Sequence, residues 1–254
     1  KITFDTNEIS VGAGGKQVLF NALLATVNKG DEVIIPSPYW VSYPDMVVIA
    51  EGIPVIIETG IESDFKVTSE QLRKAITNKT KWIVINSPSN PTGSCYSVNE
   101  LKDLGEILDE FPHVGFISDD IYEKIVYDNF KFSTMATVIP KHKERILTVN
   151  GVSKAYSMTG WRIWYAGASK EIIKSMAKIQ SQSTTNPSSI SQYAALGALE
   201  GEEEFIFKNN KIFKKRRDLI SDIINQCKGL SVNKPSGAFY IFPSCAQLIG
   251  SKTK

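Results

Sequence analysis

Residues 145–163 read RILTVNGVSKAYSMTGWRI, and this stretch joins a predicted strand to a predicted binding turn. The apolar run Arg145 to Val149 predicts a strand, the polar turn after it presents Lys154 among small and aromatic neighbours, and Arg162 follows eight residues later. A desolvated lysine has a lowered pKa and a nucleophilic amine, and arginine offers a planar fork of donors to phosphate. The pair suits a carbonyl compound that carries a phosphate. A surface lysine and an ion-pairing arginine are the commoner explanation of such a pair, so other segments must decide.

Around this stretch, short runs rich in β-branched and aromatic residues alternate with helical patterns. The predicted strands are 9–11, 32–35, 55–57, 81–86, 114–118, 145–149 and 164–167. The predicted helices are 16–27, 41–50, 69–76, 98–110, 171–180 and 189–199, and the third begins at a capping pattern formed by Thr68 and Gln71. Such alternation predicts an α/β fold, with a mostly parallel sheet sandwiched by helices.

The end of the chain has a different pattern. A long helical stretch, 202–225, is followed by a Pro-Ser-Gly turn at 235–237 and a predicted strand at 238–242. We place a large sheet domain at 1–201, and at 202–254 a connecting helix with the beginning of a smaller α+β domain. Because the chain begins without methionine and almost at once enters a strand, we expect it to be a fragment that lacks an N-terminal segment and the rest of the small domain.

With 254 residues, 42% hydrophobic and 22% charged, the chain has the composition of a globular protein. A net charge of +2 argues against a nucleic-acid partner, and the basic stretch 208–217 also adjoins Asp218, which predicts a solvated helix face. The apolar runs are too short for a membrane span, so we expect no membrane partner. Cys95, Cys227 and Cys245 are odd in number and lack metal-ligand spacing, which predicts a cytoplasmic protein with no metal site.

Ligands of open α/β sheets bind beyond the carboxyl ends of the strands, so the residues that follow each strand are candidates. After strand 9–11, the sequence GAGGK at 12–16 opens a helix, where glycines admit a ligand and free N–H groups attract an anion. This is not a P-loop, because Ser10 and Gln17 replace residues that the motif requires. A capping turn is the alternative.

Two further strand ends carry aromatic and amide side chains. After strand 32–35, the stiff sequence PSPYW at 36–40 holds Trp40 where a flat ligand can stack, although a core tryptophan is the alternative. After strand 81–86, the prolines of SPSNPTG at 87–93 fix the direction of Asn90, although a plain turn has a similar sequence.

The predicted strand at 114–118 is followed by Asp119 and Asp120 and, two residues later, by Tyr122. A carboxylate can pair with a pyridinium nitrogen and a phenol can donate to a ring oxygen, which are the needs of an electron-sink cofactor. Capping of the following turn is the alternative for one of the two aspartates.

As a set, these segments resemble the large domain of fold-type I pyridoxal-phosphate-dependent enzymes, in particular the aspartate aminotransferase branch of the class I aminotransferases. The resemblance runs from Glu8 to Phe242 and rests on GGKQ at 14–17, SPYW at 37–40, NPTG at 90–93, DDIY at 119–122 and SKAYSMTGWR at 153–162.

The resemblance implies pyridoxal 5′-phosphate as cofactor and a role for each motif residue. Lys154 is implied to form the covalent Schiff base and to act as general base, and Asp119 to keep the pyridine nitrogen protonated. Tyr122 and Asn90 are implied to hydrogen-bond the ring's 3-oxygen, and Trp40 to stack on the ring.

The phosphate is implied to bind the backbone at Gly14, Gly15 and Lys16, together with Arg162 and Ser153. Substrate contacts are implied for three residues that also line the cofactor site: Lys16, Trp40 and Asn90.

The implied activity is transamination between an amino acid, with aspartate the leading candidate, and a 2-oxo acid such as 2-oxoglutarate, by a ping-pong mechanism through pyridoxamine phosphate in a homodimer. Aromatic, kynurenine and prephenate aminotransferases and β-lyases share the cofactor residues. A non-catalytic regulator domain and an inactive fragment also stay open.

Two positions depart from the family pattern. Some members have serine at the position of Gly151, and relatives often read Arg-Ile-Gly-Tyr where this chain has Trp164 in place of that glycine. The arginine that grips the substrate α-carboxylate and the tyrosine that reaches the partner subunit's phosphate have no counterpart here.

Overall fold

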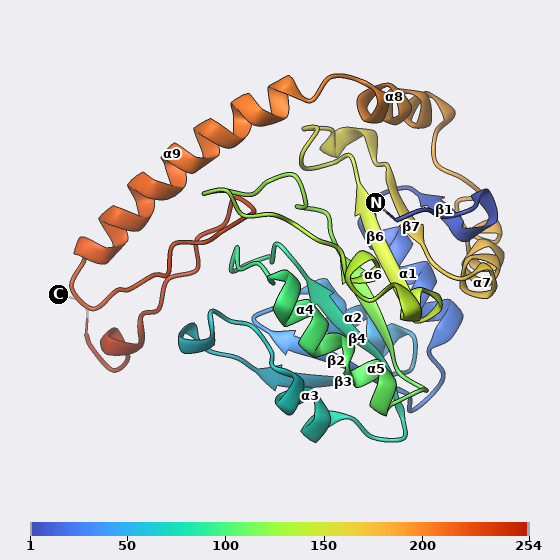
Figure 1. The fold of residues 1–254 in the computed structure, drawn as a ribbon, viewed down its shortest axis with the longest axis horizontal. Coiled ribbons are helices and arrows are strands. Elements are labelled where there is room, and N and C mark those ends of the chain that lie inside the picture. The colour runs from blue at the N-terminus through green and yellow to red at the C-terminus, as the bar shows by residue number, and fades with distance from the viewer. Residues whose placement is uncertain (1, 253–254) are drawn as a thin grey trace.

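The computed structural model describes residues 2–252, and its core is a seven-stranded sheet in the order β1-β7-β6-β5-β4-β2-β3 (Figure 1). The strands are β1 (Ile9–Gly12), β2 (Glu32–Ser37), β3 (Ile53–Glu58), β4 (Thr80–Asn86), β5 (Gly115–Asp119), β6 (Ile146–Gly151) and β7 (Trp164–Gly167). Neighbours from β6 to β3 pair in parallel, whereas β7 pairs antiparallel with both β6 and β1. The predicted mostly parallel sheet is confirmed.

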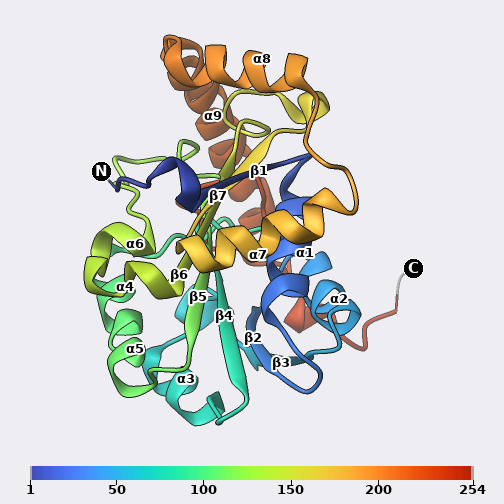
Figure 2. The same ribbon diagram turned by 90° about the vertical axis from the view of Figure 1, so that its right-hand side faces the viewer.

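Helices cover both faces of this sheet (Figure 2). They are α1 (Gly15–Thr26), α2 (Ser42–Ile49), α3 (Ser69–Ala75), α4 (Val98–Gly105), α5 (Ile107–Glu110), α6 (Met135–Val138), α7 (Lys170–Ser181), α8 (Ser189–Glu200) and α9 (Glu204–Gln226). The predicted capping pattern is confirmed at α3, where the Thr68 hydroxyl accepts from the Gln71 amide and the Gln71 side chain accepts from the Thr68 amide.

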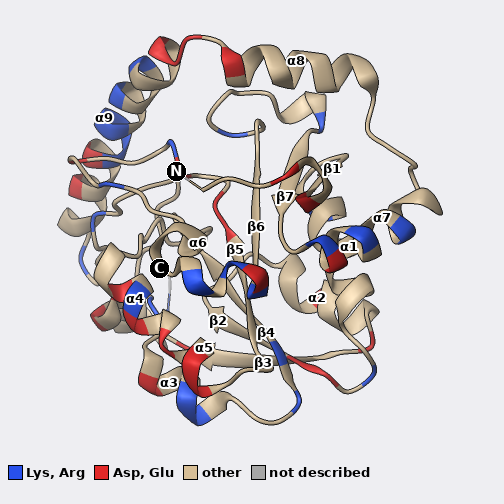
Figure 3. Cartoon of the chain, turned by 45° about the vertical axis from the view of Figure 1, so that its right-hand side comes forward, with Lys and Arg blue, Asp and Glu red and all other residues tan. Residues whose placement is uncertain are grey.

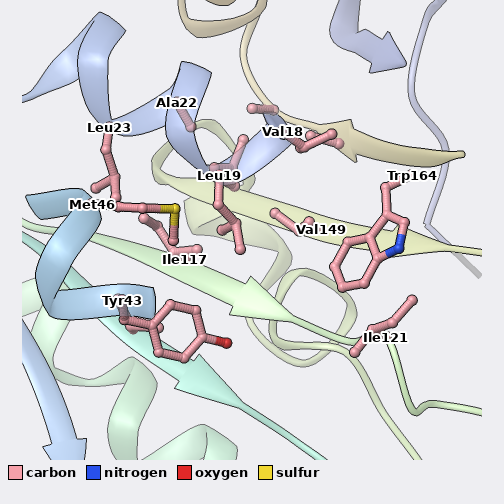
Figure 4. Close-up of a cluster of buried hydrophobic side chains, with 14 of the residues drawn as sticks. Val18, Leu19, Ala22, Leu23, Tyr43, Met46, Ile117, Ile121, Val149 and Trp164 are labelled. Atoms are coloured by element: carbon pink, nitrogen blue, oxygen red, sulfur yellow. The ribbon is translucent and has the colours of Figure 1, made fainter. Parts of the chain in front are cut away.

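The strands divide the core into two layers because successive side chains of a strand point to opposite faces. On β4, Trp82 and Val84 belong to the layer under α1, α2 and α7, while Ile83 and Ile85 belong to the layer under α3 to α6. Figure 4 shows part of the first layer, including Leu19 of α1. Burial on both faces explains why the strands read as apolar runs without alternation.

The last part of the chain leaves the sheet and returns to the loop after β5. Helix α9 runs past the sheet (Figure 1). Arg217 on this helix is buried, with Nη2 2.6 Å from Asp128 Oδ2 and Nη1 donating to the Pro235 carbonyl at 2.8 Å. The strand predicted at 238–242 is wrong, since no strand forms there in the described chain. Its backbone bonds instead to the loop after β5, where the Ala238 amide donates to the Ile125 carbonyl.

In residues 2–252, no helix combines the length and apolar character that a membrane crossing requires. The domain boundary at 201 stays a prediction.

Candidate active site

A cavity of about 240 Å³ opens at the carboxyl ends of β4, β5 and β6, beside the start of α1. All residues predicted to hold a cofactor line it except Gly14, which lies directly behind Arg162. The sheet brings these residues together because parallel strands end at one edge. Segments far apart in the sequence therefore meet in one site.

Lys154 enters the cavity from the turn after β6. Its amine lies 5.9 Å from the ring centroids of Tyr122 and Phe239, so it is placed beside two aromatic rings. Burial lowers the pKa of this amine, the charge of Arg162 lowers it further, and Asp119 opposes both effects. A larger fraction of the amine is therefore neutral and nucleophilic than in water.

Asp119 ends β5 and is 2% exposed. Its Oδ2 accepts the Tyr43 hydroxyl at 2.7 Å, and its Oδ1 accepts the Ile121 amide at 3.3 Å, which is the turn-capping bond considered from the sequence. Burial raises the pKa of this carboxyl to about 6, although both hydrogen bonds and the Lys154 charge act in the opposite direction. Asp120 lies outside the cavity lining and accepts from the Ser118 hydroxyl.

Tyr122 and Asn90 reach the cavity from the loops after β5 and β4. The hydroxyls of Tyr122 and Tyr240 are 2.5 Å apart, and burial raises the pKa of Tyr122, so this phenol keeps its proton. The loop that carries Asn90 is held by Asn86, whose Oδ1 accepts the Asn90 amide at 2.7 Å and whose Nδ2 donates to the Asp119 carbonyl at 2.8 Å.

The start of α1 and Arg162 form a cationic, donor-rich end of the cavity. Gly14 has φ +96°, and a Cβ there would lie 2.1 Å from Arg162 Nη2, so only glycine fits. The first amides of a helix have no partner within the helix, and Gly15 and Lys16 at the start of α1 line this cavity. Lys16 lies beside it, with Nζ 5.4 Å from the centre of the Trp40 ring.

Trp164 accounts for both departures from the family pattern. Its indole is 7% exposed, and Nε1 donates to the Ser153 hydroxyl at 2.8 Å. A Cβ on Gly15 would lie 2.3 Å from the indole ring, and one on Gly151 would lie 2.6 Å from it. The large residue at 164 therefore fits because glycine stands at 15 and 151.

Trp40 lines the cavity and also packs against the core, and its stacking on a ligand stays a prediction. Its ring meets the Tyr43 ring edge-on, with centroids 5.4 Å apart and planes at 89°. Tyr43, Asn86 and Tyr240 contact predicted site residues, yet nothing in their sequence context marked them as members of the site.

These residues fit a planar aldehyde that carries a phosphate. The glycine at 14 leaves room for Arg162 beside the helix N-terminus, which suits an anion, while the amine of Lys154, with its lowered pKa, and the carboxylate of Asp119 lie in the same cavity. The donor set and the space both agree with pyridoxal phosphate.

Comparison with known proteins gives one consistent family. The model of the family described as aminotransferase class I and II matches residues 1–253. The probable aspartate/prephenate aminotransferase of Rickettsia bellii (strain RML369-C) is 57% identical over 253 residues, which cover 100% of this chain and 63% of that protein.

Two solved structures show the same fold. The crystal structure of the aspartate aminotransferase from Rhizobium meliloti matches with a TM-score of 0.96 at 51% identity, over 97% of this chain and 62% of that one. The aromatic aminotransferase from Pyrococcus horikoshii OT3 matches with a TM-score of 0.91 at 38% identity, over 95% of this chain and 65% of that one. The chain thus spans less than two thirds of the length of these relatives.

Proposed function

The chain belongs to the class I and class II aminotransferase family, and we propose that it binds pyridoxal phosphate in the cavity at the strand ends. We propose further that the whole protein moves an amino group between an amino acid and a 2-oxo acid. The observation that carries this proposal is the meeting of Lys154, Asp119 and Arg162 in one cavity at the start of α1.

When bound, pyridoxal phosphate supplies an aldehyde for covalent capture of amines and a ring that withdraws electrons from the substrate Cα. Lys154 would hold the cofactor through its amine and would serve as the general base that moves a proton at the substrate Cα. Its lowered pKa supports both roles, because each needs the neutral amine.

Asp119 favours a protonated ring nitrogen, because a buried carboxylate stabilises a positive charge beside it. Tyr122 and Asn90, which also line the cavity, would donate to the ring's 3-oxygen. Trp40 stacks on the ring, and its edge-on contact with Tyr43 fixes its orientation.

Arg162, the first amides of α1 and the Ser153 hydroxyl bind the phosphate. Ser153 is suited to this role because its oxygen already accepts the indole N–H of Trp164, which leaves its own hydrogen free to donate.

Aspartate with 2-oxoglutarate is the proposed substrate pair. The name of the Rickettsia bellii relative includes aspartate and prephenate, and Lys16 offers a cation for the distal carboxylate of a dicarboxylic substrate. Prephenate is the second candidate on the same ground. No contact within residues 2–252 favours a β-lyase, a kynurenine aminotransferase or a regulator domain.

A second copy of the chain is the proposed partner. On α8, Ile190 and Tyr193 are 73% and 77% exposed, and an apolar groove runs between this helix and strands β1 and β7. Figure 3 shows charged residues along α9, whereas α8 carries almost none before its end. Sedimentation of wild type and Tyr193→Asp tests whether two copies associate through α8. Equal association of both proteins would contradict this interface.

The function itself is tested by mixing the protein with pyridoxal phosphate and following near-ultraviolet to visible absorbance, then adding aspartate and 2-oxoglutarate. We expect tight binding and formation of glutamate. Lys16→Met should raise the KM for aspartate and leave that for aromatic amino acids unchanged. A chain that binds no cofactor would overturn the proposal.

A further inference from the structure

Tyr43 contacts two of the predicted cofactor residues from one position. It lies in the first turn of α2 (Figure 4), is 3% exposed and lines the cavity. Its hydroxyl donates to Asp119 Oδ2 at 2.7 Å, and its ring meets the Trp40 ring edge-on at 5.4 Å. These contacts join α2 to the residues proposed to face the cofactor ring.

The hydrogen bond matters because Asp119 lies where burial disfavours its charge. Burial raises the pKa of this carboxyl to about 6, and the Tyr43 hydroxyl is the strongest of the groups that lower it again. Burial and the nearby carboxylate raise the pKa of Tyr43 itself, so its phenol stays protonated and donates throughout the neutral range.

The titratable groups around the Asp119 carboxylate come from four elements: Tyr43 on α2, Lys154 after β6, Asp120 and Tyr122 after β5, and Tyr240 after α9. Among them, Tyr43 and Lys154 stabilise the ionised form, and Lys154 becomes bonded to the cofactor in the proposed function. Of these two groups, Tyr43 then remains as the one that stabilises the ionised carboxylate.

We propose that Tyr43 is a positioning residue that keeps the Asp119 carboxylate ionised and fixed in orientation, while its ring braces Trp40 over the same cavity. The catalytic part of this proposal rests on the proposed function, whereas the effect of Tyr43 on Asp119 does not. Without the phenol, Asp119 binds a proton at higher pH, and a neutral acid pairs poorly with a protonated ring nitrogen.

The first test measures Asp119 in the protein without added cofactor, by carbon-13 NMR of labelled aspartate carboxyls. Asp119→Asn identifies the resonance. A hydrogen bond to an ionised group changes proton affinity by roughly ten- to a hundred-fold, so Tyr43→Phe should raise the Asp119 pKa by about one to two. Phenylalanine keeps the ring and so isolates the hydroxyl.

Tyr96→Phe is the matched control. Tyr96 is 6% exposed and its hydroxyl accepts the Val67 amide at 2.8 Å, but it lies in the other core layer. We expect this variant to lose a comparable amount of thermal stability and to leave the Asp119 titration unchanged. Equal Asp119 pKa values in Tyr43→Phe and wild type would overturn the proposal.

The second test is the dissociation constant of pyridoxal phosphate as a function of pH. Binding should weaken below the Asp119 pKa, and in Tyr43→Phe that weakening should begin at higher pH. Tyr43→Leu, which also removes the brace on Trp40, should bind more weakly at every pH. If wild type binds no cofactor but the NMR difference appears, the proposed function fails and the role of Tyr43 stands.

Discussion

The packing of Trp164 against two glycines gives a prediction that is independent of any ligand. In Gly151→Ala, the new Cβ would lie 2.6 Å from the Trp164 ring and 2.9 Å from the Ile163 carbonyl oxygen. Trp164 cannot move away cheaply because it is buried and its indole N–H is bonded to Ser153. Overpacking of this kind costs about 1–3 kcal/mol, and contact with a backbone atom favours the upper part of that range.

The assay is urea unfolding of the protein without cofactor, with Gly160→Ala as control. Gly160 lies in the same loop, and its Cβ would have no atom within 4 Å, so we expect a change of no more than about 0.5 kcal/mol in the free energy of unfolding. Trp164→Ala alone should cost about 3–5 kcal/mol. Combined with Gly151→Ala, it should cost less than the two single changes together.

Additive costs in the double variant, or a Gly151→Ala change as small as that of the control, would refute this explanation of Gly151 and Trp164. The result also bears on the site, because the same indole orients Ser153. A tolerated methyl at 151 would mean that this wall of the cavity is looser than the structure indicates.

Three further predictions test individual groups. Asp119→Asn should abolish the half-reaction with glutamate and lower the cofactor affinity to about that of wild type below the Asp119 pKa, and an unchanged rate would assign ring protonation to another group. Arg162→Ala should weaken binding of pyridoxal phosphate but not of pyridoxal, which lacks the phosphate; equal losses for both would exclude a phosphate role. Burial raises the pKa of Asp119 from 3.8 to about 6 in the folded protein, which therefore binds this proton more tightly than the unfolded chain does. The stabilisation from the bound proton is complete below pH 3.8 and is lost as the pH rises through 6. Asp119→Asn should therefore reduce the fall in unfolding free energy over this range by about 3 kcal/mol, as measured by urea titrations at several pH values.

Much of the fold was predictable because local signals and global arrangement agree. The central strands are apolar runs that are buried on both faces. All strands except the antiparallel β7 have their carboxyl ends at one edge, and this edge could be identified without knowing the order of the strands. Residues at those ends, such as Asp119 and Lys154, could therefore be grouped from the sequence.

Side chains that act through other side chains could not be found in this way. Tyr43 is one more aromatic residue in an apolar helix, and only its distance to Asp119, 76 positions later, distinguishes it. The predicted strand at 238–242 failed for a related reason: its pattern suits a strand, but its backbone meets a loop rather than a sheet edge. Trp164 likewise gained an explanation only when Gly15 and Gly151 were seen against it.

Lys154 is proposed to hold pyridoxal phosphate covalently, and borohydride reduction followed by peptide mass mapping examines that bond itself. We predict one stable adduct, on the peptide that contains Lys154, and loss of that adduct together with the visible absorbance in Lys154→Ala. An adduct on another lysine, or a reducible chromophore that survives in Lys154→Ala, would contradict the assignment of Lys154 as the cofactor's anchor.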